Sequence, residues 1–233
     1  MTNFTPTTTQ QMVFSDNKKK GYLISITKRQ IDFPADGMNS ILLHGTYGTG
    51  KTTYADIFFS EYEKSYGGDF PIIDKVTCDG SVPVSSLVKR FNNSVMYISQ
   101  NLSNKHYLLL DEFDNYSLGK QKQLKGFLNR ENIVCIFTTN YLDMIDKGIQ
   151  SRSLVVGMNQ SNDVSDYVRR MREIVDEHRL AMPSQTNLVS IAQTNDGDWR
   201  KMCGTLRRVC AKISAPTYKP STTKKNQFSI VKK

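Results

Sequence analysis

The chain has little cysteine or histidine and no long apolar run. Its 233 residues include 4 Cys and 3 His; the cysteines are widely spaced, with no CxxC pair and no histidine nearby. This composition disfavours a zinc site and indicates reduced thiols in a cytosol-like compartment. No segment approaches the ~20 apolar residues of a membrane span, and the polar start lacks the apolar core of a signal peptide. We therefore expect neither secretion nor membrane insertion.

Acidic residues are also scarce, with 22 Asp+Glu against 31 Lys+Arg and a formal charge of +9. Such an excess hints at a polyanionic partner. Five of the lysines lie after Pro216 in a segment without acidic residues: Lys219, Lys224, Lys225, Lys232 and Lys233. More than half of the net charge thus belongs to a tail, and the charge alone does not identify a nucleic-acid-binding body.

Apolar strand-like runs alternate with helical patterns over the first two thirds of the chain. Short apolar runs predict strands at Ser40–His44, Pro71–Thr77, Tyr107–Leu110 and Ile133–Phe137. Helical spacing predicts helices between them, at Thr53–Tyr62, Leu87–Ser99 and Lys120–Leu128. This alternation indicates an α/β fold with a parallel sheet and flanking helices.

The pattern changes near residue 158. Apolar residues then recur at helical spacing from Val164 to Val175 and from Trp199 to Ile213, which predicts a small helical domain. We divide the chain into a loosely ordered arm (1–37), an α/β nucleotide-binding domain (38–158), a helical lid (159–215) and a disordered basic tail (216–233).

One segment fits the phosphate-binding pattern G-x-x-x-x-G-K-[ST] without a mismatch. It is Gly45-Thr46-Tyr47-Gly48-Thr49-Gly50-Lys51-Thr52, followed by Thr53, and it stands between a predicted strand and a predicted helix. Glycines let backbone N–H groups surround a β-phosphate at the start of a helix. Lys51 would neutralise phosphate charge, and the Thr52 hydroxyl would bind Mg²⁺. The sequence therefore predicts an ATP and Mg²⁺ site.

A phosphate-binding loop of this kind works together with an acidic residue at the end of another apolar strand. Asp111 and Glu112 follow Leu108–Leu110. Asp111 would hold Mg²⁺, and Glu112 would activate the attacking water as a general base. Asn140 follows the next apolar run, where its side chain would reach the γ-phosphate; an asparagine that merely starts a turn is the alternative.

These motifs, in this order, resemble those of AAA+ ATPases, and more narrowly those of DNA sliding-clamp loaders: replication factor C small subunits and their T4-type phage counterparts. The resemblance also includes Cys78–Ser81, Ile149–Ser153 and Gly197–Lys201, and it covers residues 38–213. It implies that Asn140 is sensor 1, that Arg152 is an arginine finger for an adjacent subunit, and that Arg200 is sensor 2. A surface arginine and a helix-face charge are the alternatives for the two arginines.

The resemblance further implies an oligomer with active sites between subunits, and work on DNA and a sliding clamp or another replication protein. The protein would then work in the cytoplasm or in the replication compartment of a virus- or phage-infected cell. Three features depart from the family: we expect no collar domain after the lid, no Lys-Tyr-Arg-Pro segment precedes the sheet, and Ser153 replaces a cysteine. A compact viral version, or a replication ATPase with its own mode of assembly, fits these departures.

Basic residues after the second and third strands are candidates for sequence-independent DNA contact. They are Lys89, Arg90, Lys120, Lys122 and Lys125. A solvated helix face is an equal alternative for the last three. Two other functions stay open: a small viral helicase or helicase loader, and a non-enzymatic DNA-binding or scaffold module with a vestigial nucleotide site.

Overall fold

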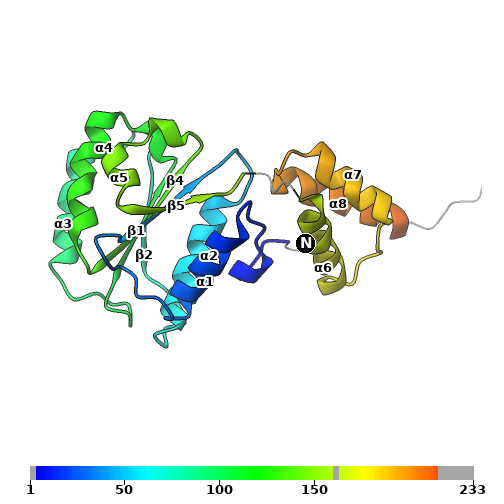
Figure 1. Cartoon of the computed structure of the whole chain (residues 1–233), viewed down its shortest axis with the longest axis horizontal. Helices are drawn as coiled ribbons and strands as arrows, with labels where there is room; N and C mark the ends of the chain where they lie inside the picture. The colour runs from blue at the N-terminus through cyan, green and yellow to red at the C-terminus, as the bar shows by residue number, and fades with distance from the viewer. Residues whose placement is uncertain (1–3, 160–162, 215–233) are drawn as a thin grey trace, which may run out of the picture.

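The computed structural model describes residues 4–159 and 163–214, which form an α/β domain followed by a helical unit (Figure 1). All strands are parallel and form one sheet in the order β2-β3-β4-β1-β5. Their bounds are β1 Ser40–His44, β2 Ile73–Thr77, β3 His106–Asp111, β4 Ile133–Thr139 and β5 Ser153–Gly157. The predicted α/β architecture with a parallel sheet is confirmed.

Helices cover both faces of this sheet (Figure 1). On one face lie α1 (Asn17–Thr27) and α2 (Lys51–Lys64), side by side. On the other lie α3 (Val84–Val95), α4 (Leu118–Leu124) and α5 (Lys147–Gln150). Short 3₁₀ turns complete the domain at Thr9–Gln11, Phe113–Asn115, Lys125–Asn129 and Leu142–Met144.

Two hydrophobic cores follow from the alternation of side chains along each strand. In β1, Ile41 and Leu43 pack in the core that contains α1 and α2, whereas Leu42 packs in the core that contains α3. Every residue of β4 is buried, because that strand lies in the interior of the sheet with helices on both faces.

Strand register brings the predicted motifs to one edge of the sheet. His44 pairs with Thr139, and Leu110 pairs with Phe137. The residues that follow β1, β3 and β4 therefore emerge side by side at the carboxyl ends of parallel strands, where open α/β sheets bind ligands.

The sequence pattern did not predict β5. It is short, and its three apolar residues stand between a serine and a glycine, so the apolar run is too short to predict a strand. It pairs with β1 and is an edge strand of the sheet. Two side chains donate to its outward backbone oxygens: Lys19 Nζ to Val155 O at 2.6 Å and Ser15 Oγ to Gly157 O at 3.0 Å. Partner groups of this kind protect an exposed strand edge.

Three helices form the C-terminal unit: α6 (Val164–Glu177), α7 (Gln185–Thr194) and α8 (Trp199–Ser214). Their apolar faces meet in a third core around Met171, Leu188 and Leu206, each fully buried. We call this unit the lid. Within the part of the chain that the structure describes, no helix combines the length and the apolar character needed to cross a membrane.

The predicted loose order of the N-terminal arm is wrong for the described residues. Residues 4–16, which we call the strap, run along both domains. Phe4 and Val13 are buried in the core of the lid, whereas Met12 and Phe14 are buried in the core beside α2. The strap is polar and rich in threonine, so its few apolar residues show no period, and only tertiary contacts order it.

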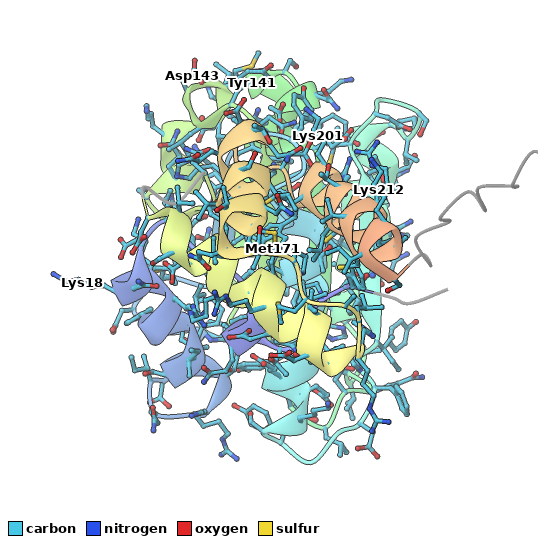
Figure 2. All side chains as sticks on the ribbon, turned by 90° about the vertical axis from the view of Figure 1, so that its right-hand side faces the viewer. Lys18, Tyr141, Asp143, Met171, Lys201 and Lys212 are labelled. Carbon is cyan, nitrogen blue, oxygen red and sulfur yellow. The ribbon has the colours of Figure 1, made fainter. Side chains whose placement is uncertain are left out.

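Two of the three lysines of α1, Lys19 and Lys20, make structural contacts through their side chains, whereas Lys18 is exposed and projects from the surface (Figure 2). Asp16 caps the helix by accepting from the backbone N–H groups of Lys18 and Lys19. Lys20 Nζ donates to the carbonyl oxygens of Gln10 and Met12 at 3.0 and 2.7 Å. These bonds attach α1 to the strap. The predicted basic tail, 216–233, lies outside the described residues.

Candidate functional site

The phosphate-binding loop joins β1 to α2. Gly48 and Gly50 have φ angles of 77° and 91°, and Gly50 is the N-cap of α2. Glycine adopts this left-handed conformation without the steric penalty that a Cβ brings, so the loop can turn sharply into the helix. The N-terminus of α2 therefore faces the loop, an arrangement in which backbone N–H groups and the helix dipole favour an anion.

Other loop residues fix the shape of this turn. Thr49 is buried and its hydroxyl donates to Thr46 O at 2.9 Å. The Thr46 N–H donates to Asn159 Oδ1 at 3.1 Å, and Gly45 N–H donates to Thr139 O at 3.2 Å. Tyr47 is 62% exposed at the outer turn of the loop. Thr53, in the first turn of α2, lines the cavity described below.

Lys51 lies at the centre of the site with 9% of its surface exposed. Its ammonium group donates to Gly45 O at 2.7 Å, Thr46 O at 2.9 Å and Asn140 Oδ1 at 2.9 Å. Burial lowers the pKa of Lys51 to about 8, with Arg200 acting in the same direction and the carboxylate of Asp111 opposing it. An anion at this position would favour the charged ammonium.

Asp111, at the end of β3, faces the hydroxyl of Thr52. Thr52 Oγ1 donates to the two carboxylate oxygens of Asp111 at 2.9 and 3.1 Å. A second hydroxyl, that of Thr138 on β4, also donates to this carboxylate. The structure thus brings together the two residues that sequence analysis assigned to Mg²⁺, and it adds Thr138 as the group that orients the carboxylate.

Glu112 has a backbone conformation that is uncommon for a residue with a side chain, with φ at 55°. Its N–H donates to Thr138 Oγ1 at 3.0 Å, which holds the turn. Its carboxylate is exposed and accepts a long bond from Asn115 Nδ2 at 3.4 Å. Backbone strain of this kind persists where surrounding contacts impose it, and it concentrates at functional sites.

Asn140 follows β4, and its side chain meets Lys51 as described. The backbone N–H of Asn140 donates to Asp114 Oδ1 at 3.2 Å. Asp114, in the turn after β3, thereby positions the loop that carries Asn140.

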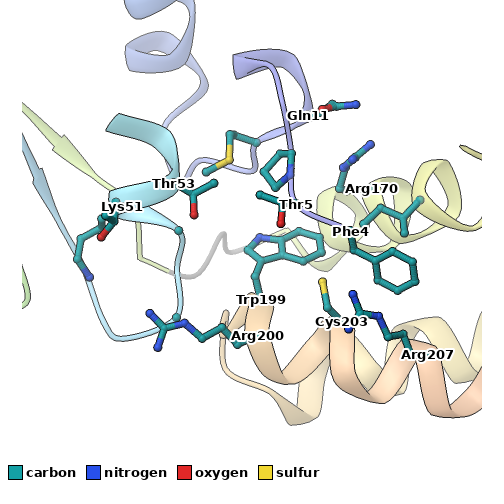
Figure 3. A pocket seen from close by; sticks show the side chains of 16 residues that line it. Phe4, Thr5, Gln11, Lys51, Thr53, Arg170, Trp199, Arg200, Cys203 and Arg207 are labelled. Carbon is teal, nitrogen blue, oxygen red and sulfur yellow. The ribbon is translucent and has the colours of Figure 1, made fainter. Parts of the chain in front are cut away.

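A cavity of about 240 Å³ opens between the phosphate-binding loop, the strap and the lid (Figure 3). Gly48, Gly50, Lys51 and Thr52 line one end. The strap lines another part through Phe4, Thr5, Pro6, Gln11 and Met12, and the lid contributes Arg170, Ile174, Trp199, Arg200, Cys203 and Arg207. Three segments far apart in the sequence thus enclose the space beside the loop.

The start of α8 is attached directly to the phosphate-binding loop. Trp199 N–H donates to Gly48 O at 3.0 Å. Asp198 caps the helix by accepting from Lys201 N–H at 3.1 Å, and a Cβ at Gly48 would lie 2.2 Å from Asp198 Oδ1. This close approach sets the position of Arg200, which is exposed and lines the cavity.

Arg152 lies at the opposite end of the sheet. It precedes β5, where Ser153 pairs with Ser40 at the start of β1. Four residue steps along β1 separate that end from the loop, about 13 Å. Arg152 is half-buried and its Nη1 donates to Gly148 O at 2.9 Å. The structure therefore does not bring Arg152 to the cavity beside the phosphate-binding loop.

The basic residues considered for DNA contact lie on two neighbouring helices, α3 and α4, and the turn after α4. Lys89, Arg90, Lys120 and Lys122 are exposed. Arg90 pairs with Asp74 at 2.5 Å, and Lys120 lies 5.5 Å from the centre of the Tyr116 ring. Lys125 is half-buried and pairs with Asp146 at 2.6 Å, so its charge is partly neutralised.

Sequence analysis missed the strap, Thr138, Asn159 and Asp198 as parts of the site. For Thr138 a signal existed, since it immediately follows an apolar run whose end adjoins Asp111 in a parallel sheet. The strap carried no comparable signal. No cluster of three or more His, Cys, Asp or Glu side chains that suits a metal occurs in the described ranges.

Comparison with known proteins identifies the family. Residues 41–159 match the ATPase family associated with various cellular activities (AAA). The chain belongs to this family. It is an AAA ATPase, and the matched segment contains the phosphate-binding loop and all of the sheet except Ser40. No curated protein sequence matches the chain.

Solved structures with a similar fold include variants of RuvB from Thermotoga maritima. One superposes with a TM-score of 0.66 at 14% identity, covering 88% of this AAA ATPase and 64% of RuvB. Another gives 0.67 at 13% identity, covering 91% and 68%. The chain thus spans about two thirds of the length of these RuvB chains. At such low identity the likeness shows the fold alone, and this fold includes the lid.

Proposed function

We propose that this AAA ATPase binds ATP in the cavity beside the phosphate-binding loop and hydrolyses it there. The observation that carries the proposal is the contact between Thr52 and Asp111, next to the buried ammonium of Lys51. These groups come from two different strand ends, and they converge where the β- and γ-phosphates would lie above the start of α2.

The residues present fit a magnesium ion. Mg²⁺ prefers oxygen ligands, and in phosphate sites it is held by one or two protein groups together with water and phosphate oxygens. The Thr52 hydroxyl and the Asp111 carboxylate are such groups. When bound, Mg²⁺ would neutralise charge on the phosphates. Thr138 keeps the carboxylate of Asp111 turned toward Thr52.

Hydrolysis would proceed by in-line attack of water on the γ-phosphate. Glu112 is exposed beside Asp111 and would accept a proton from that water as general base. Asn140 would orient the water or bind the γ-phosphate. Lys51, whose ammonium bonds to Asn140, would bind the β- and γ-phosphates.

Two arginines complete the proposed site. Arg200 would pair with the γ-phosphate from the lid of the same subunit. Arg152 would act on the nucleotide of a neighbouring subunit, and its place at the far end of the sheet supports that role. A guanidinium supplied in this way is worth ~10³–10⁵ in rate in well-studied NTPases. The proposal therefore includes an oligomer with active sites between subunits.

We further propose that the ATPase works on DNA in replication, as a clamp-loader-like subunit that engages primer-template DNA and a sliding clamp. Support comes from the motif resemblance and from exposed basic residues on neighbouring helices α3 and α4. Lys89, Arg90, Lys120 and Lys122 would contact phosphates without reading bases. Lys125 is a weaker candidate because it pairs with Asp146.

The test is to measure ATP turnover, and the mass in solution with a non-hydrolysable ATP analogue, with and without primed DNA and a sliding clamp. We expect primed DNA to raise turnover, and the analogue to favour an oligomer. A Lys120→Ala/Lys122→Ala variant should bind DNA more weakly, with a flatter salt dependence. The control variant, Lys18→Ala/Lys28→Ala, removes the same charge from α1 and its C-cap, beside the other face of the sheet. This variant should bind DNA as tightly as the wild-type chain. Equal loss in both variants, or turnover indifferent to DNA, would contradict the DNA role.

A further inference from the structure

The nucleotide cavity extends well past the phosphate-binding loop, and this extension has its own chemistry. Its walls beyond Thr53 are largely apolar: Phe4, Pro6 and Met12 from the strap, and Ile174 and Trp199 from the lid. Phosphates would occupy the end near Lys51, because Gly48, Gly50 and Thr52 lie there. The cavity continues from there toward the strap and the lid, which leaves room for the nucleoside at the other end.

Polar side chains at that end are already paired with one another. Gln11 Oε1 accepts from Thr7 N–H at 2.8 Å, and its Nε2 donates to Glu177 at 3.2 Å. Arg170 is buried and pairs with Glu173 and Glu177 at 3.1 and 2.9 Å. A ligand group entering here would therefore meet apolar surface and the flat faces of side chains.

Trp199 is the one tryptophan of the chain, and it is half-buried in this wall. In Figure 3 its indole projects into the cavity, facing Thr5 of the strap and Thr53 of α2. Tyr167 supports the indole from the lid, with ring centres 5.5 Å apart and planes tilted by 48°.

The start of α8, which carries this indole, is attached to the phosphate-binding loop. Trp199 N–H donates to Gly48 O at 3.0 Å, and Asp198 packs against Gly48. The residue that carries the indole is therefore itself bonded to the phosphate-binding loop. Strap and loop also touch, since Met12 Cε lies 3.1 Å from where a Cβ of Gly50 would be.

We propose that Trp199 is the base platform of the site: its indole stacks on the nucleobase and makes the cavity prefer purine over pyrimidine nucleotides. Every base has a π face, but the two-ring purine covers more of the indole, so stacking favours it. This inference rests on the proposed nucleotide site, and it adds a residue that determines specificity there.

The experiment uses ligands that cannot be hydrolysed at a γ-phosphate: ADP, GDP, CDP and inorganic pyrophosphate, each titrated calorimetrically against the full chain. We expect ADP and GDP to bind more tightly than CDP, and both purines to change the fluorescence of Trp199. Trp199→Leu should weaken ADP binding ~10-fold or more, as loss of base–aromatic stacking predicts. It should leave pyrophosphate affinity within about twofold, because its backbone bond to Gly48 remains.

Trp199→Phe keeps an aromatic ring against Tyr167 and should retain most of the ADP affinity, which separates stacking from a folding defect. Three results would each overturn the proposed role of Trp199. They are equal ADP affinity in Trp199→Leu and the wild-type chain, an equal loss of ADP and pyrophosphate affinity in Trp199→Leu, and CDP binding as tight as ADP binding. Failure of the wild-type chain to bind ADP and ATP at all would instead overturn the proposed nucleotide site.

Discussion

The ammonium group of Lys51 donates a hydrogen bond to the side-chain oxygen of Asn140 at 2.9 Å. This bond joins the phosphate-binding loop to the tip of β4, so two residues 89 positions apart meet at the site. Asp114 holds the backbone of Asn140 from the turn after β3. One hydrogen-bond network therefore connects the ends of β1, β3 and β4. A γ-phosphate bound by Lys51 would alter contacts at all three strand ends.

Nucleotide binding should depend on the proton of Lys51. Burial lowers the pKa of this group to about 8, whereas an exposed lysine titrates near 10.5. The folded chain therefore holds fewer protons than the unfolded chain between those values, so burial of the ammonium destabilises the fold fully below pH 8, and this penalty diminishes as pH rises from 8 to 10.5. Bound phosphates favour the ammonium, so nucleotide affinity should fall as pH rises above 8.

Calorimetry in two buffers of different ionisation enthalpy checks this coupling. At pH 8 about half of the Lys51 groups are uncharged, so ADP binding should take up about half a proton. The uptake should vanish at pH 6.5. Equal heats in the two buffers at pH 8, with ADP bound, would show that Lys51 is already fully charged.

The two proposed halves of a shared active site should complement each other. Arg152→Ala subunits should bind ATP but hydrolyse it slowly, and Glu112→Gln subunits should lose turnover by ~10²–10⁴ through loss of the general base. When the two are mixed, one class of interface regains both groups and turnover should recover in part. Lack of recovery in a confirmed mixed oligomer would argue against Arg152 as a residue that acts between subunits.

Gly48→Ala should loosen the attachment of the lid to the loop. Gly48 has φ at 77°, and an added Cβ would lie 2.2 Å from Asp198 Oδ1. The left-handed backbone alone costs a residue with a side chain about 1–2 kcal/mol, and Asp198 must also move. We expect a lower free energy of unfolding and a higher KM for ATP.

Gly21→Ala is the matched control. Gly21 lies inside α1 with open space around it, so alanine should stabilise the helix by about 0.5–1 kcal/mol. Denaturant unfolding and steady-state turnover of both variants provide the comparison. If Gly48→Ala keeps wild-type KM and stability, the contact between Gly48 and Asp198 does not hold the lid.

The strap should contribute to both stability and nucleotide affinity. Phe4 is 4% exposed in the core of the lid, with the guanidinium of Arg207 4.5 Å from the centre of its ring. Phe4→Ala should destabilise the chain by roughly 3 kcal/mol, as other buried phenylalanines do, and should weaken ADP binding because Phe4 lines the cavity. Phe70→Ala removes a ring that is 89% exposed and should change neither. If Phe4→Ala and Phe70→Ala lower the free energy of urea unfolding equally, Phe4 does not anchor the strap in the core of the lid.

The sequence predicted those parts of the site that are contiguous in the chain. Lys51 and Thr52 stand in a single motif, and Asp111 ends an apolar run that could only be a buried strand. In both cases local pattern and tertiary role coincide, since parallel strands covered on both faces must be continuously apolar.

The rest depends on contacts between distant segments. Phe4 and Met12 lie in a polar stretch without period, and they are buried only because two domains meet around them. Trp199 read as one apolar position of a helix, and nothing in the sequence near it indicates that its indole lines the cavity. β5 was missed because Ser153 and Gly157 interrupt the apolar pattern at both ends of a short strand.

The most direct test of the account is phosphate release from ATP by the purified full chain in the presence of Mg²⁺. The matched variants are Lys51→Ala and Lys64→Ala, which remove a lysine from the first and the last turn of the same helix, α2. The account predicts turnover by the wild-type chain, wild-type turnover by Lys64→Ala, and none above background by Lys51→Ala. Wild-type turnover by a folded Lys51→Ala variant would contradict it.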